Sequence, residues 1–588
     1  MPKKILTYAL TAVCLCAMAG CKQAAAKMKA RKDKAEAAKI VIPPHVKGTV
    51  AEYAALVGGG GLPVQAHGIV VGLGKNGSAE VPAHLAKQLE QYLLKQDLGS
   101  AVSGTSAITP SRVLSDLDTT VVLVGGAVPP GAPVGTRFDL HVAALPQTQT
   151  RSLDGGMLMP IDLTLAYGGM SHPTAQTQTW GLAAGQVFVN PFADPDRPDD
   201  LPKLLSGRVI NGGKVTRSRD VRLQLRRSDY GQADLMQRRI NERFPDEQGI
   251  GSDDAQHGSR KTANAISRST LELRIPSNYR TNYEHFLQLV MHLPVHYAEG
   301  GPEGFARQIA EEMQAPGARH EELALVWEAM GRGVLSVVQS QYTSSNPAAA
   351  FYAARTGLRL GDNLAAEVVM RHATSPNSPH RLTAIEELGS YRMLTAAATV
   401  LRGMLDDTNE AVRIAAYEAL LKRGDRSAVT RIDIAGQFSL DVVPTAHRYA
   451  IYATQTGEPK IVLFGRDMAV RRPLFFESGG ELVTVNANSD SEKLTVFRRI
   501  PRTGGVSDAL KSDATVRALI ELLGTPPKVG KDGQVTGLGL SYSQVVGILY
   551  RLGEEDGIPA KLVLQQMPDV QRIYQDAGTV GRPDAPGL

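Results

Sequence analysis

The sequence predicts an α+β protein with several domains: a mixed strand and helix body, a block of repeated helices, and a C-terminal part that is β-rich and then helical. A chain of 588 residues is too long for one hydrophobic core. Between about Val46 and Val295, short β-branched runs alternate with turns rich in glycine and proline. From about Glu303 to Asp425, alanine and leucine recur at helical spacing. Strand-like runs return at residue 432.

The N-terminus has the layout of an export signal. Lys3 and Lys4 precede the apolar stretch Ile5 to Ala19, and about 15 residues make roughly 22 Å of helix, less than the roughly 30 Å hydrocarbon core of a membrane. The end of the stretch resembles the lipobox of bacterial lipoproteins, in which the cysteine after Ala-Gly is acylated. Residues 1–21 are therefore interpreted as a lipoprotein signal peptide with Cys21 as the lipid attachment site. Ordinary signal cleavage, with Cys21 incidental, is the alternative.

Residues 22–45 form a basic tether that has almost no apolar face to bury. The basic charge of the chain, +5 overall, is concentrated before residue 40, so the body that follows is not basic and nucleic acid is not an expected partner. Lysines next to a lipid anchor are attracted to anionic headgroups. In lipoproteins of this type, Lys22 after the cysteine resembles an outer-membrane address. All three cysteines lie in the first 21 residues, which excludes a disulfide framework or a thiolate metal site in the body.

Residues 46–300 are expected to form the α+β body. Predicted strands and helices are bounded by turn-forming glycine and proline. The strands are Gly68–Gly72, Thr119–Val124 and Arg137–Ala143, and the helices are Pro82–Leu94 and Gln232–Phe244.

Three motifs in the body suggest a ligand site but lack the required context. Gly72 to Gly77 spells G-x-G-x-x-G, yet no helix starts at once after it, which favours a plain turn over a nucleotide site. The pair His292 and His296 is interrupted by Pro294, which disfavours a helical metal site. The acidic turn Asp194–Asp200 lacks the glycine and glutamate of a calcium loop. We predict no catalytic residue, no cofactor and no metal.

The arginines between Arg208 and Arg243 form the densest basic stretch of the body. Acidic residues, namely Asp220, Asp229, Asp234 and Glu242, are interspersed with them, which favours a solvated face. A surface that touches a polymer or a partner is the alternative.

Residues 301–431 are predicted as stacked helical pairs. Arg381 and Arg413, like Leu388 and Leu420, recur with a period of about 32 residues, which is typical of helical solenoids. The segment 406–425 resembles a HEAT-type repeat, and a concave protein-binding surface is the expected use of such a block. An irregular helical bundle is the alternative. Beyond it we expect a β-rich segment at 432–500, a C-terminal helical module at 501–577 and a disordered tail at 578–588.

The body also carries a co-linear set of motifs that resembles the bacterial flagellar basal-body P-ring protein family. The string Gly207-Arg-Val-Ile-Asn-Gly-Gly-Lys-Val is similar to the family's G-R-I-P-N-G-A-x-V, and Arg151-Ser-Leu-Asp-Gly-Gly-Met-Leu to its S-L-x-G-G-x-L. Its G-x-V-V-G-L and G-x-R-x-D occur at residues 68–73 and 135–139. The residues that carry these motifs are Gly68, Gly72, Arg137, Asp139, Gly155, Gly156, Gly207, Arg208, Asn211 and Gly212.

The resemblance implies a structural, non-enzymatic subunit that forms a periplasmic ring around the flagellar rod through head-to-tail contacts. The implied partners are further copies of the chain, the rod and the outer-membrane ring proteins, with the cell-wall polymer as a further candidate and the membrane reached through the lipid anchor. The helical block, the missing cysteine pair and the lipobox depart from the family. A periplasmic adaptor lipoprotein that binds a partner through its HEAT-like repeats is the main alternative, and an enzyme acting on cell-wall polymer is a third reading.

Overall fold

The fold is described from a computed structural model of the chain. The described residues are 46–95, 109–166, 178–194, 197–219, 221–245, 261–280, 282–297, 300–392, 394–445, 449–478, 482–499, 505–529 and 535–566. Cys21, the predicted tether at 22–45 and the predicted tail at 578–588 lie outside these ranges. Within them, no helix is long and apolar enough to cross a membrane.

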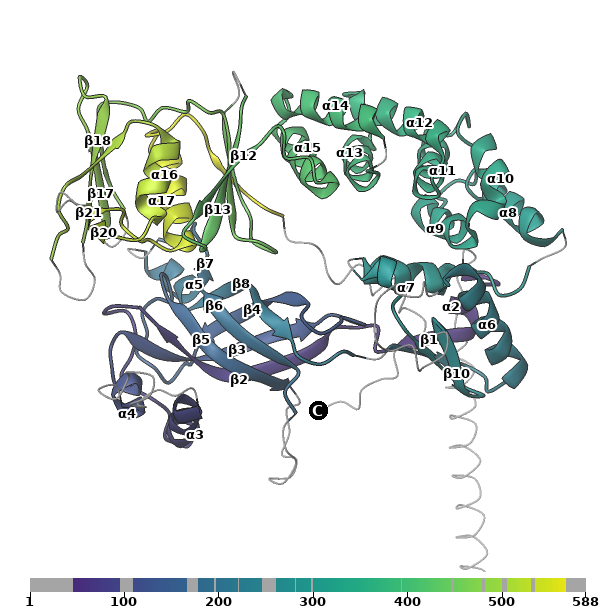
Figure 1. Cartoon of the computed structure of the whole chain (residues 1–588), viewed down its shortest axis with the longest axis horizontal. Coiled ribbons are helices and arrows are strands. Elements are labelled where there is room, and N and C mark those ends of the chain that lie inside the picture. The colour runs from purple at the N-terminus through teal and green to yellow at the C-terminus, as the bar shows by residue number, and fades with distance from the viewer. Residues whose placement is uncertain are drawn as a thin grey trace, which may run out of the picture.

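The first half of the chain builds a closed antiparallel β-barrel (Figure 1). Its strands are β2 (Leu62–Val71), β3 (Thr119–Val128), β4 (Arg137–Ala144), β5 (Met157–Leu165), β6 (Gly181–Gln186) and β8 (Ser206–Val215), in the order β4-β3-β2-β5-β6-β8. Pairing of β4 with β8 closes the barrel, and the short β7 (Phe188–Val189) adds to β8. Alternate valine and leucine side chains fill the interior. Helices α3 (Ala83–Lys95) and α4 (Pro110–Leu114) pack on the outside, and α5 (Leu201–Leu204) precedes β8.

A smaller α/β domain uses both the start of the body and the chain that follows the barrel. The segments α2 (Val50–Tyr53) and β1 (Ala54–Val57) precede the barrel, and the sheet order is β1-β9-β11-β10. The remaining elements are β9 (Val221–Leu225), α6 (Tyr230–Arg243), β10 (Ala263–Ser267), β11 (Thr270–Leu273) and α7 (Tyr283–His292). Asp229 caps α6 by accepting hydrogen bonds from the backbone of Gly231 at 2.7 Å and Gln232 at 3.2 Å. The buried face of α6 covers one side of the sheet.

The helical block follows as predicted. Its helices are α8 (Gly301–Glu312), α9 (His320–Met330), α10 (Leu335–Ser340), α11 (Pro347–Arg359), α12 (Asn363–Thr374), α13 (Arg381–Ser390), α14 (Thr395–Gly403) and α15 (Glu410–Arg423). Asn346, Asp362 and Asn409 cap α11, α12 and α15 through their side chains, which fixes where each helix begins. Buried alanines allow α9 to pack closely on α11 and α13 on α15, and α12 packs against both α11 and α13.

The last part of the chain forms one domain around two sheets. The first sheet contains β12 (Thr430–Ile434), β13 (Phe438–Val443), β15 (Lys460–Phe464), β14 (Ala450–Ala453) and β22 (Leu562–Leu564). The second contains β16 (Leu474–Glu477), β17 (Val483–Ala487), β18 (Lys493–Arg498) and β19 (Leu510–Asp513), and β20 (Lys528–Val529) pairs with β21 (Val535–Thr536). Helices α16 (Val516–Gly524) and α17 (Tyr542–Glu554) share a core with both sheets, so the predicted segments 432–500 and 501–577 pack together. The α+β fold class with a helical insert is confirmed.

Both ends of the helical block dock on other domains of the same chain (Figure 1). At the first end, Leu325 and Ala329 of α9 join the core of the small α/β domain. At the other end, the Tyr417 hydroxyl donates to Asp441 of β13 at 2.5 Å. The C-terminal domain in turn rests on the barrel. The block therefore bridges the small α/β domain and the C-terminal domain.

Candidate functional site

The family-motif residues on β4 and β8 meet in one hydrogen-bonded cluster. Asp139 accepts a hydrogen bond from Arg208 Nη2 at 3.0 Å and from the backbone N–H of Asn211 at 2.6 Å. Arg137 Nη1 donates to the carbonyl of Asn211 at 3.2 Å. Asn211 has φ 56°, a left-handed conformation that asparagine tolerates better than most residues. The cluster thus holds an irregular turn of β8 against β4, at the point where the barrel closes.

Two motif glycines of β8 allow close packing beside this cluster. A Cβ at Gly212 would lie 2.2 Å from Val209 Cγ1, and one at Gly207 would lie 2.8 Å from the carbonyl oxygen of Phe188. Neither contact leaves room for a side chain. These residues therefore shape the barrel wall and have no chemical role that the geometry supports.

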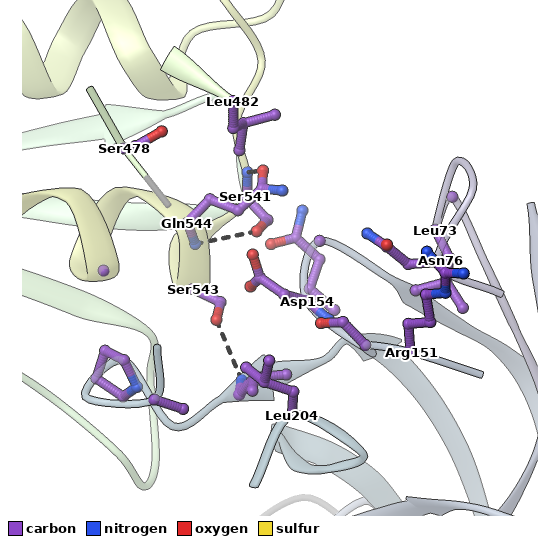
Figure 2. Close-up of a pocket in the computed structure, with 18 of the residues that line it drawn as sticks. Leu73, Asn76, Arg151, Asp154, Leu204, Ser478, Leu482, Ser541, Ser543 and Gln544 are labelled. Carbon is purple, nitrogen blue, oxygen red and sulfur yellow. Dashed lines mark hydrogen bonds between the residues drawn. The ribbon is translucent and has the colours of Figure 1, made fainter. Parts of the chain in front are cut away.

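The Ser-Leu-Asp-Gly-Gly motif forms a seat for helix α17 of the C-terminal domain (Figure 2). Asp154 accepts side-chain hydrogen bonds from Ser543 and Gln544, although burial raises the pKa of its carboxyl. Gly155 has φ 76°, and a Cβ there would lie 2.5 Å from Gln544 Nε2. The backbone N–H of Val189 donates to Ser543 Oγ at 3.1 Å. The motif is thus the contact point of two domains.

The N-terminus of α17 is capped next to this contact. Ser541 and Gln544 form a capping box, with Ser541 N–H donating to Gln544 Oε1 at 3.2 Å and Gln544 N–H to Ser541 Oγ at 3.3 Å. Around it, Arg551 pairs with Asp194 at 2.9 Å, and the Phe192 and Tyr550 rings lie 4.5 Å apart. A mixed polar and aromatic contact therefore holds the C-terminal domain on the barrel.

A cavity of about 1110 Å³ opens beside this seat, between the barrel and the C-terminal domain. Its polar lining includes Asn76, Arg151, Asp154, Arg498 and Gln544. Figure 2 shows Asp154 pointing toward the start of α17 and Arg151 near Asn76.

Asp154 belongs to a motif that was recognised in the sequence, but no contact was predicted for it or for Ser543, Gln544 and Arg551. The Ser-x-x-Gln spacing of a capping box was the available signal for the start of α17. The contact between Val189 and Ser543, which lie 354 positions apart, could not be predicted from one sequence.

The other sequence motifs occupy structural positions. Gly72 and Gly74 have φ 85° and 64° in the turn after β2, and α3 starts only at Ala83. His292 Nδ1 lies 2.8 Å from the carbonyl of Gln288, whereas His296 Nε2 lies 3.0 Å from Gln232 Oε1, so the two imidazoles have separate partners. In the acidic turn, Asp200 pairs with Lys203 at 2.6 Å. Among the described residues, no group of three potential metal ligands occurs.

The arginine stretch serves two purposes. Arg238 pairs with Asp234 at 3.1 Å on the exposed face of α6, which agrees with the solvated face expected for this stretch. Arg243, in contrast, donates to the carbonyl of Ala329 at 2.8 Å and joins α6 to the helical block. Arg226 donates to the carbonyl of Glu52 at 3.1 Å and ties β9 to α2.

Comparison with known proteins matches the body and the helical block to two different families. Residues 50–301 match the family model for the flagellar P-ring protein. The body is thus similar to the flagellar P-ring protein. Residues 332–432 match the model for HEAT repeats, which confirms the predicted character of the insert.

Three flagellar P-ring proteins show the extent of this similarity. The flagellar P-ring protein of Nitrobacter hamburgensis is 26% identical over 323 residues, which cover 53% of this chain and 76% of the relative. That of Nitrobacter winogradskyi is 26% identical, with 52% and 75% covered. That of a Bradyrhizobium species is 26% identical, with 48% and 68% covered. The similarity supports a structural, non-enzymatic, P-ring-like role, as the motifs predicted.

Proposed function

We propose that the chain is a lipid-anchored subunit of a periplasmic ring around the flagellar rod. The similarity of residues 50–301 to the flagellar P-ring protein supports this proposal most directly, because the relatives are flagellar P-ring proteins. The described motif residues stabilise the barrel and its contact with α17, which is consistent with a scaffold that presents surfaces to neighbours. Head-to-tail contacts between copies close such a ring, so two different surfaces of one subunit are involved. The rod and the outer-membrane ring proteins are the proposed partners.

The helical block is proposed to brace the subunit. Its two ends contact the small α/β domain and the C-terminal domain, so two of its surfaces are already occupied by the same chain. This observation favours the ring subunit over an adaptor that uses the repeats as a free binding arm. Electron microscopy of basal bodies, with an antibody against the HEAT block, tests the placement. Label on the basal body supports the proposal, and label only elsewhere in the envelope favours the adaptor.

The anchor is proposed to be an acyl group on Cys21 that holds the subunit at the outer membrane. Two or more acyl chains make such binding stable, and the basic residues after Cys21 add electrostatic attraction. Replacement Cys21→Ser is expected to move the protein from the membrane fraction to the soluble periplasmic fraction without changing its circular dichroism spectrum. A variant that stays with the membrane fraction contradicts the anchor.

A further inference from the structure

The cavity between the barrel and the C-terminal domain is lined by more positive than negative charge. Arg151 on the barrel side and Arg498, Arg499 and Arg551 on the opposite side contribute guanidinium groups, whereas Asp154 is the one carboxylate in the lining among the described residues. Arg551 is neutralised by Asp194, with which it pairs at 2.9 Å. A cleft with low-dielectric walls and one sign of charge concentrates ligands of the opposite sign. The cavity therefore favours an anion.

Arg498 gives the strongest indication of an anionic ligand in this cavity. Burial lowers its pKa, which means that the charged guanidinium is partly removed from water. It donates to the carbonyl of Leu538, but no described carboxylate pairs with it. Arg151 is exposed, and its guanidinium has no hydrogen-bond acceptor among the described residues. Partly buried charges in proteins are normally paired, so Arg498 is suited to a carboxylate that comes from a ligand, and the exposed guanidinium of Arg151 can contact the same carboxylate.

The rest of the lining suits a peptide. Leu73, Leu204, Leu482 and Ile548 provide apolar contact, and side-chain amides, including those of Asn76 and Gln186, can bind backbone N–H and C=O groups. The volume of about 1110 Å³ exceeds the usual range of ligand pockets, about 300–1,000 Å³, so an extended segment has room. We propose that this cavity binds an acidic peptide segment, with a glutamate or aspartate carboxylate between Arg151 and Arg498 and apolar side chains on the leucine-lined wall. The proposal does not depend on ring assembly.

Fluorescence anisotropy of a labelled Glu-Leu-Glu-Leu-Glu-Leu peptide with the detergent-solubilised full chain tests this proposal. We expect saturable binding that weakens with added salt, and affinity about tenfold lower for Arg498→Gln and for the exposed Arg151→Gln. Arg307→Gln on α8, where the side chain is 68% exposed and pairs with Glu303, is the matched control and is expected to bind like the original protein.

Three outcomes overturn the proposal. The first is absence of saturable binding. The second is equal affinity for the matched Gln-Leu-Gln-Leu-Gln-Leu peptide, which shows that the peptide carboxylates are not recognised. The third is displacement of the peptide by millimolar inorganic phosphate, which shows a simple anion site.

Discussion

The replacement Glu328→Gln probes the contact between the helical block and the small α/β domain. Glu328 of α9 is 7% exposed, and its carboxylate lies 2.5 Å from His285 Nε2 of α7 and 3.0 Å from Arg359 Nη1 of α11. Arg359 also pairs with Glu387 of α13. One buried carboxylate thus joins a helix of the α/β domain to two helices of the block.

The magnitude follows from the pKa of Glu328. Burial alone would raise it, but the hydrogen bond from His285 and the charge of Arg359 outweigh burial and lower the pKa from 4.5 to about 2. Because one pKa unit corresponds to about 1.4 kcal/mol, the ionised carboxylate stabilises the folded state by about 3 kcal/mol at pH 7. This stability is present above pH 4.5 and is lost as the pH falls toward 2. At pH 4 the effect is expected to be about 1 kcal/mol smaller.

Urea unfolding followed by Trp327 fluorescence provides the assay. Trp327 is fully buried next to Glu328, and Trp180 is the other tryptophan of the chain, so the Trp180→Phe background reports on α9 alone. We expect Glu328→Gln to lower the unfolding free energy of this region by about 3 kcal/mol. Glu303→Gln on α8 is the control, because Glu303 is 59% exposed, its partner Arg307 is 68% exposed, and such surface pairs contribute about 0–1 kcal/mol. Equal losses in the two variants would refute the reasoning.

Three further predictions concern the junctions and the helical block. Gly155→Ala adds a Cβ 2.5 Å from Gln544 Nε2 at a residue with φ 76°, so amide hydrogen exchange in α17 should become faster. Gly436→Ala is the control, because Gly436 has φ 70° but no atom within 4 Å of the added Cβ. Similar exchange in the two variants would contradict the contact between Gly155 and α17. Tyr417→Phe removes the 2.5 Å hydrogen bond to the fully buried Asp441 and should lower the stability of this contact by about 1–2 kcal/mol. Amide hydrogen exchange in β13 should then be faster, and unchanged exchange would contradict the docking of the helical block on the C-terminal domain. Burial and the charges of His372, His320 and Arg355 lower the pKa of His380. The folded state therefore binds fewer protons than the unfolded state, and the free energy of unfolding should fall as the pH drops below 6.5. His380→Phe, which keeps the ring stacked on Phe351, should reduce the fall in the Trp327 unfolding midpoint between pH 7.5 and 5.5, and an identical fall contradicts this reasoning.

Local patterns predicted most of the elements but not how they pair. The strand predicted at Thr119–Val124 extends to Val128 as β3, and the helix predicted at Gln232–Phe244 starts at Tyr230, where Asp229 caps it. Hydrophobic spacing and turn residues determine such elements locally. Closure of the barrel by β4 and β8 depends on pairing between distant residues, for which one sequence holds no signal.

Of the contact between the barrel and α17, only the barrel motif was recognisable from the sequence. The Ser-Leu-Asp-Gly-Gly motif was recognised only through the family resemblance, and the structure shows that its Gly155 has a positive φ. What the motif contacts could not be predicted, because Ser543 and Gln544 reach Asp154 only after two separate domains have folded and docked. The same applies to the helical block, whose repeat period was readable but whose docking at both ends depends on tertiary packing.

Electron cryo-microscopy of basal bodies isolated from cells that express the tagged chain tests the central claim most directly. We expect a closed ring around the rod, in which each subunit carries the barrel, the small α/β domain and a HEAT block that contacts both the α/β domain and the C-terminal domain. Basal bodies that lack the chain, together with a purified protein that stays monomeric, would contradict it.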